Sequence, residues 1–90
     1  MIVTLEEMKQ YLRVDFDDDD SLIETLITSA TCLCMDITRQ DEAAFEESEN
    51  AKPAIYYAVA YLYEHREEAD HHALTLTLRS LLFGSRKEAF

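Results

Sequence analysis

Glycine and proline are almost absent from this chain, with one residue of each among 90. Both are the usual residues of tight turns, and average usage is several times higher. A chain so poor in them builds few turns and hairpins, so we expect an all-α fold. No apolar run approaches the roughly 18 residues of a membrane span, and no basic segment precedes an apolar run near the start. We therefore expect no membrane partner and no signal peptide.

The residue patterns of common catalytic and metal sites are missing too. No glycine-rich loop could cradle a phosphate, and no side chain has a sequence context that would activate it as a nucleophile. The run 17–20 is all aspartate, without the alternating ligands and central glycine of an EF-hand loop. His65, His71 and His72 have no second cluster at zinc spacing. We expect no enzyme, no cofactor and no metal site.

Cysteine is scarce, and its spacing excludes a local disulfide. Cys32 and Cys34 are two positions apart on a predicted helix, which places their side chains about 200° apart around the helix axis. They cannot bond to each other in that arrangement. Two thiols without a disulfide framework fit a reducing compartment such as the cytosol.

Basic residues are outnumbered, with 8 Lys and Arg against 19 Asp and Glu for a net charge of −11. Residues 1–50 hold fourteen acidic and three basic residues, whereas residues 51–90 hold five of each. This balance argues against binding nucleic acid through phosphate contacts. An acidic surface can instead repel DNA, attract a basic protein or imitate DNA, or it can be a solvated face that maintains solubility.

The start of the chain carries strong helix signals. Thr4 and Glu7 have the spacing of a capping box, and Val3 and Met8 have that of a hydrophobic staple. The run 17–20 places negative charge at the start of a second helix, where the helix dipole favours it.

These residues resemble the start of the small head-tail connector (adaptor) proteins of tailed phages and prophages. That family opens with a Thr-Leu-Glu-Glu-like cap and a Lys-x-Tyr-Leu-Arg-Val-Asp segment, followed by an acidic turn and Leu-Ile, as residues 4–23 do. The match weakens after Thr38-Arg39, where a Thr-Gly-Arg-like turn would stand. It returns at 54–68, with Glu64-His65-Arg66-Glu67, and at 81–86, Leu-Leu-Phe-Gly-Ser-Arg, and covers roughly two thirds of the chain.

The resemblance implies an all-helical structural virion protein, made in the bacterial host cytoplasm and located at the head-tail junction. It implies a homo-oligomeric ring, twelvefold in the particle, that docks on the portal protein beside other head-completion or tail proteins. The ring would continue the DNA channel toward the tail, and DNA would pass without specific binding. The family's C-terminal end meets the portal, which makes Arg86, Lys87 and Phe90 the docking candidates. The charge leaves a different class open, a small acidic DNA mimic or regulatory protein that binds a basic partner.

The apolar periodicity predicts one helical domain over residues 1–90, a small bundle of about four helices with a long central pair. The helices are expected at about 5–12, 18–39, 51–68 and 75–83, and a C-terminal tail follows Gly84. In the elbow between the first two helices, Val14 and Phe16 should point inward. Residues 40–51 form an acidic connection, with or without a turn of helix at 42–47, that Phe45 should pin to the core.

Four residues are candidates for subunit contacts. Cys32 and Met35 are neighbours on the side of their helix away from its apolar stripe and should be exposed, although single exposed apolar residues are common. Tyr57 and Tyr61 belong to a helix that is apolar nearly all round. Either that helix is central to the fold, or its tyrosine face meets another subunit.

The acidic residues Asp17, Asp18, Asp19 and Glu24 are candidates for an exposed acidic surface. If this surface lined a channel, it would keep DNA from adhering, because phosphate contacts are what hold DNA to proteins.

Overall fold

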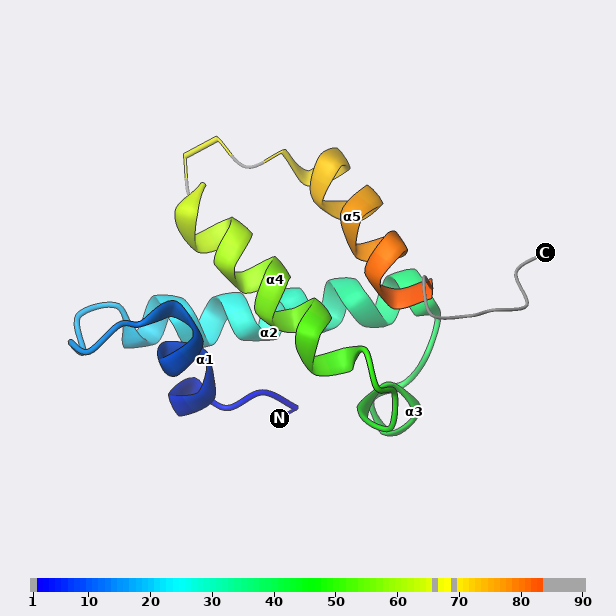
Figure 1. The fold of residues 1–90 in the computed structure, drawn as a ribbon, viewed down its shortest axis with the longest axis horizontal. Helices are drawn as coiled ribbons and strands as arrows, with labels where there is room; N and C mark the ends of the chain where they lie inside the picture. Colours follow the sequence, from blue (N-terminus) through cyan, green and yellow to red (C-terminus); the bar gives the residue numbers. More distant parts are fainter. Residues whose placement is uncertain (1, 66, 69, 84–90) are drawn as a thin grey trace.

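The computed structural model describes residues 2–65, 67–68 and 70–83, and this part of the chain is helical without a strand. The helices are α1 (Leu5–Leu12), α2 (Asp20–Thr38), α3 (Glu42–Glu46), α4 (Ala51–Glu64) and α5 (His71–Phe83). The prediction of a small all-α bundle is confirmed, with the short α3 added to the expected four helices. The long α2 runs the length of the molecule and α4 crosses it, while α1 and α5 pack near its opposite ends (Figure 1).

The core lies between α2, α4 and α5 and is closed by α1, α3 and the N-terminal segment. On α4 the buried positions recur at intervals of three and four residues, which is the stripe of a helix with one core-facing side. Small alanines make up much of that stripe and let α4 approach α2 closely. The buried apolar residues are Ile2, Val3, Met8, Ile23, Ile27, Ala30, Cys34, Phe45, Ala51, Ala54, Ile55, Ala58, Val59, Leu74, Leu78 and Leu82.

The first helix begins with the capping box that its sequence predicts. The Glu7 amide donates to Thr4 Oγ1 at 3.1 Å, and the Thr4 amide donates to Glu7 Oε1 at 3.0 Å. Val3 and Met8, the pair expected to form the hydrophobic staple, are both fully buried. The cap therefore fixes both the start of α1 and the direction from which the chain enters it.

Two arginines end helices where glycine is usual. Arg13 follows α1 with φ 61° and Arg39 follows α2 with φ 58°, both in the left-handed region. The Arg13 amide donates to the Gln10 carbonyl, and the Arg39 amide donates to the Met35 carbonyl. Arg39 stands where the connector resemblance called for a glycine turn. The same backbone turn is thus made without glycine, at a conformational cost of about 1–2 kcal/mol.

Three helix bounds differ from the sequence-based ones by two or more residues, and α2 also ends one residue early, at Thr38. The second helix begins at Asp20 rather than 18, because Asp19 has a non-helical backbone (φ −104°, ψ 12°). The helix expected at 51–68, which is α4, ends at Glu64. There the His65 amide closes the last turn by donating to the Tyr61 carbonyl. The last begins at His71 rather than 75, because the Asp70 carboxylate accepts a hydrogen bond from the Ala73 amide at 3.0 Å and caps the helix.

The connection between α2 and α4 contains a true helix. Asp41 caps α3 by accepting from the Ala44 amide at 2.9 Å. Phe45 is fully buried, as predicted, and holds the short helix against the core.

The elbow before α2 departs from its prediction at Phe16. Val14 is half-buried and packs against the core, but Phe16 is 51% exposed, so its inward placement was wrong. The elbow is held instead by Lys9, whose ammonium lies 3.0 Å from Asp17 Oδ1 and 2.7 Å from Asp20 Oδ1. An ion pair between α1 and the start of α2 thus anchors the elbow where the sequence suggested an aromatic ring.

Among the residues that the structure describes, α2 is the one helix that is long and apolar enough to cross a membrane, with a mean hydropathy of 1.2. In the fold, its stripe from Ile23 to Cys34 is buried against other helices, and its outer side carries the exposed carboxylates of Glu24 and Asp36. This is the pattern of a core helix in a small bundle.

Candidate subunit and partner interfaces

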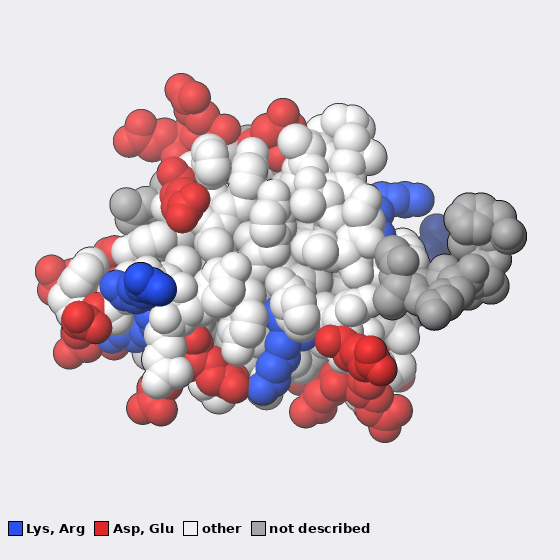
Figure 2. Space-filling view, viewed as in Figure 1, with Lys and Arg blue, Asp and Glu red and all other residues white. Residues whose placement is uncertain are grey.

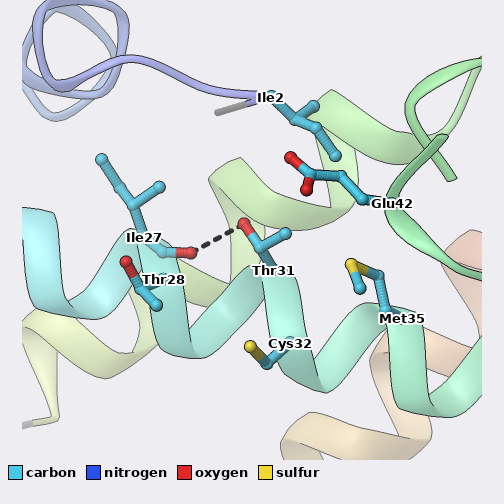
Figure 3. A pocket seen from close by; sticks show the side chains of 7 residues that line it. All are labelled: Ile2, Ile27, Thr28, Thr31, Cys32, Met35 and Glu42. Atoms are coloured by element: carbon cyan, nitrogen blue, oxygen red, sulfur yellow. Dashed lines mark hydrogen bonds between the residues drawn. The ribbon is translucent and has the colours of Figure 1, made fainter.

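Cys32 and Met35 line a pocket on the flank of α2, beside the core residues Ile2 and Ile27 (Figure 3). Cys32 is exposed as expected, whereas Met35 is half-buried and packs partly against the core. The pocket has a volume of about 220 Å³. Its remaining lining residues are Ile2, Ile27, Thr28, Thr31 and Glu42.

Three separate segments build this pocket. α2 supplies the floor, the N-terminal segment supplies Ile2, and α3 supplies Glu42 at the rim. The Thr31 hydroxyl donates to the Ile27 carbonyl at 2.7 Å, so its polar atom is occupied by the helix backbone (Figure 3). The pocket is therefore mainly apolar with a carboxylate at one side. The sequence pointed only to Cys32 and Met35, because nothing local signals that Ile2 and Glu42 meet them.

Tyr57 and Tyr61 are half-buried and pack against the core from the outer side of α4. Their ring centroids are 6.4 Å apart, and the Tyr61 ring stacks on His65 at 4.3 Å. The Tyr61 hydroxyl accepts from the Asp70 amide at 3.0 Å, so it braces the turn that leads into α5. These contacts favour the view of α4 as the central helix, while part of each ring is still available to a partner.

A second aromatic contact joins α1 to α4. Tyr11 stacks on Tyr56 with centroids 4.8 Å apart and an interplanar angle of 12°, and Tyr11 is 52% exposed. Beside it, the Lys52 ammonium lies 2.9 Å from Glu7 Oε2. The sequence analysis missed this pairing because residues 11 and 56 share no local pattern.

The four acidic candidates do not form one uniform surface. Asp18 and Glu24 are exposed, and Asp17 is highly exposed but is paired with Lys9. Asp19 is half-buried, and its Oδ2 accepts from the Tyr63 hydroxyl at 2.6 Å. The hydrogen bonds that the Lys9 ammonium donates to Asp20 and Asp17 raise the pKa of Lys9, so this cation stays charged and neutralises part of the elbow.

Charge is distributed unevenly over the face of the molecule that Figure 2 shows. Acidic side chains gather at the elbow end, around α3 and near the end of α4, while the centre of the face over α4 carries almost none (Figure 2). A broad uncharged area bordered by carboxylates is the usual make-up of a protein-binding surface rather than a nucleic-acid-binding one.

α5 has two exposed leucines that the sequence analysis did not single out, Leu76 on its outer side and Leu81 nearer its core-facing side. Leu76 is 53% exposed and Leu81 is 37% exposed. Arg79 is exposed on the same helix, and residues 71–83 contain no Asp or Glu. The signal was present in the closely spaced leucines, but only the packing shows which of them face outward.

Arg86, Lys87 and Phe90, the candidates for portal docking, lie outside the described residues. Within the described ranges, no three His, Cys, Asp or Glu side chains are grouped as a metal site would need.

Comparison with known proteins identifies the family. The model of the phage gp6-like head-tail connector protein family matches residues 2–88, a span that includes all five helices. No curated protein and no solved structure matches the chain. Since the family match covers almost the entire sequence, including the capped start and the α5 segment, this chain belongs to the phage gp6-like head-tail connector family.

Proposed function

We propose that this protein forms a ring on the portal of the filled phage head and extends the DNA channel toward the tail. Family membership makes it a structural connector protein of the phage virion that associates with other head and tail proteins. The proposal includes a ring of twelve subunits in the particle and the portal protein as the direct partner. It also includes synthesis in the host cytoplasm.

The observation that carries the proposal is the presence of two unlike surfaces on one subunit. A closed ring is built from heterologous contacts, in which one face of each subunit meets a different face of the next. The pocket at Cys32 and Met35 and the outer side of α5 are both partly apolar but differ in shape and charge. Tyr57 and Tyr61 remain candidates for a contact across the uncharged face.

The acidic residues fit a channel through electrostatics. Exposed carboxylates such as Asp18 and Glu24 repel phosphates, so DNA would slide past without being held. Asp17 and Asp19 would contribute less, since each already has a partner within the subunit.

Portal docking is assigned to the C-terminal residues. Arg86 and Lys87 supply positive charge, which is scarce in the first half of the chain, and Phe90 supplies an aromatic anchor.

Light scattering over a concentration series, repeated with the portal protein, tests the function. A ring-former should give species many times the 10.4 kDa subunit mass, either alone or on the portal. The variant Arg86→Glu/Lys87→Glu should lose portal binding but keep its helical content. Lys52→Gln is the control for the loss of a positive charge elsewhere in the C-terminal half, because Lys52 is exposed on α4 and lies outside the tail. A protein that stays monomeric and ignores the portal would contradict the proposal.

The alternative is a small acidic protein that imitates DNA or regulates a basic partner. The net charge of −11 favours it, but the uncharged centre of the face in Figure 2 does not resemble a continuous phosphate-like array. A mimic would remain a monomer or dimer and bind basic proteins with an affinity that falls steeply with salt.

A further inference from the structure

We propose that the outer ridge of α5 on one subunit docks into the α2 pocket of the next subunit. The α5 ridge consists of Leu76, Arg79, Ser80 and Phe83, and the α2 pocket is the cavity at Cys32 and Met35 described above. This inference rests on the proposed ring, and it adds which two surfaces make the contact.

The pocket has the size and lining to receive one large apolar side chain. Its volume of about 220 Å³ exceeds the roughly 150 Å³ in which a cavity can hold a benzene ring. Cys32, Met35 and Ile27 give it soft and apolar walls, and sulfur-containing side chains adapt readily to the shape of a partner.

The α5 ridge presents such a side chain on a rigid support. Residues 76, 79, 80 and 83 are spaced three, four and seven apart and therefore share one side of the helix. The opposite side, with Leu74, Leu78 and Leu82, is buried in the core. At 53% exposure, Leu76 is the most exposed of the large apolar side chains in the described residues, so its burial on docking has the largest hydrophobic gain.

Charge complementarity favours the α5 ridge, rather than the exposed residues of the elbow region, as the surface that docks into the α2 pocket. The pocket is bordered by Glu42 and lies beside the acidic α3, which carries no basic residue. α5 has Arg79 and no acidic residue, so the two surfaces attract. The alternative donors, Tyr11 and Phe16, lie in or next to the acidic elbow, and docking them would bring like charges together.

The placement of the two surfaces suits a repeating contact. α5 lies along one edge of the molecule, whereas α3 and the N-terminal segment lie along the opposite edge (Figure 1). Because the two edges face away from each other, a subunit that docks one partner leaves its second surface open for another. Such a contact can repeat from subunit to subunit. If the fixed rotation between neighbouring subunits adds up to a full turn, the series closes into a ring.

Disulfide trapping tests the contact directly. In Leu76→Cys, the new thiol should lie against Cys32 of the neighbouring copy, and treatment with diamide as the oxidant should give a ladder of covalent oligomers. Tyr11→Cys places a thiol of similar exposure outside the proposed contact and should give about one tenth of that product or less, since a disulfide forms only between closely placed Cα atoms. Leu76→Cys/Cys32→Ser reports any pairing between two introduced thiols, which would stop at dimers.

A charge exchange provides a second, independent test. Arg79→Glu and Glu42→Arg should each weaken self-association about tenfold, since close charge pairs at interfaces are strongly coupled. The double variant Arg79→Glu/Glu42→Arg should restore self-association, because the two charges have exchanged places and are still opposite in sign. Circular dichroism verifies that each variant keeps the helical content of the wild type.

The outcomes separate the contact from the ring itself. A ladder through Cys32 and rescue by the charge exchange support the docking. Rings that form normally in Arg79→Glu and Glu42→Arg, with no disulfide between Cys32 and the thiol introduced at position 76, overturn the docking and leave the connector role intact. A wild-type chain that stays monomeric with and without the portal overturns both.

Discussion

The Tyr63 hydroxyl near the end of α4 donates a 2.6 Å hydrogen bond to Asp19 Oδ2 at the start of α2. This contact joins residues 44 positions apart and fixes the elbow to the central helix. Together with the Lys9 pairs to Asp17 and Asp20, it gives the acidic run a structural role within the subunit.

Removal of the Tyr63 hydroxyl should therefore destabilise the fold. Tyr63→Phe should lower the free energy of unfolding by about 1 kcal/mol, the usual net value of a hydrogen bond that is only partly buried. Urea unfolding followed by circular dichroism measures it. Tyr57→Phe is the control, since Tyr57 contacts Tyr61 through its ring. If Tyr63→Phe and Asp19→Asn have fully additive effects, the two residues are not coupled and this interpretation is wrong.

Phe16, which precedes α2 in the sequence, and Phe45, which follows it, should contribute very differently to the stability of the fold. Phe45 is fully buried, and Phe45→Ala should cost about 3–5 kcal/mol through lost burial and a residual cavity. That is a large part of the stability of a domain this small. Phe16→Ala, at a side chain that is 51% exposed, should cost under about 1 kcal/mol. Thermal unfolding of the two variants compares them, and equal losses would show that Phe16 is packed in solution.

The cap of α1 should make stability depend on pH in the acid range. The Thr4 amide, and then the Lys52 ammonium, hold the pKa of Glu7 below its ordinary value of 4.5. A lowered pKa in the folded state means that this stabilisation is present above pH 4.5 and is lost as the pH falls through the folded value.

The matching experiment uses Glu7→Gln, which keeps an oxygen for the Thr4 amide but has no charge. Its melting temperature should lie below that of the wild type at pH 7, and the gap should close as the pH falls below 4.5. Glu6→Gln is the control, because Glu6 takes no part in the capping box. A gap that stays constant from pH 7 to pH 3 would rule out the charge as its cause.

The two thiols should react at very different rates. Burial raises the pKa of the Cys34 thiol from 9.0 to about 12, whereas Cys32 is exposed at the α2 pocket. At pH 8 a thiol reagent such as DTNB should label Cys32 quickly and Cys34 at least about a hundredfold more slowly, since thiolate fraction and access both fall. Cys32→Ser should remove the fast phase. If two thiols per protein reacted quickly in the native state, the core around Cys34 would have to open readily.

The sequence predicted the features that depend on neighbouring residues. The capping box of Thr4 and Glu7 lies within four positions, and α1 has the expected bounds of 5–12. The absence of turn residues indicated an all-α fold, and the order of motifs indicated the connector family before any packing was known. The start of α5 lies four residues before the expected position 75, because Asp70 caps the helix.

Only the tertiary structure determined the surfaces. Ile2, Cys32 and Glu42 come from three segments and meet at one pocket, and no local pattern relates them. The same holds for Tyr63 and Asp19, and for which leucines of α5 point outward. Helix caps and stripes arise from interactions within a turn or two, so they can be read along the chain. Pockets and ridges arise when distant helices pack, so they exist only after the whole core has formed.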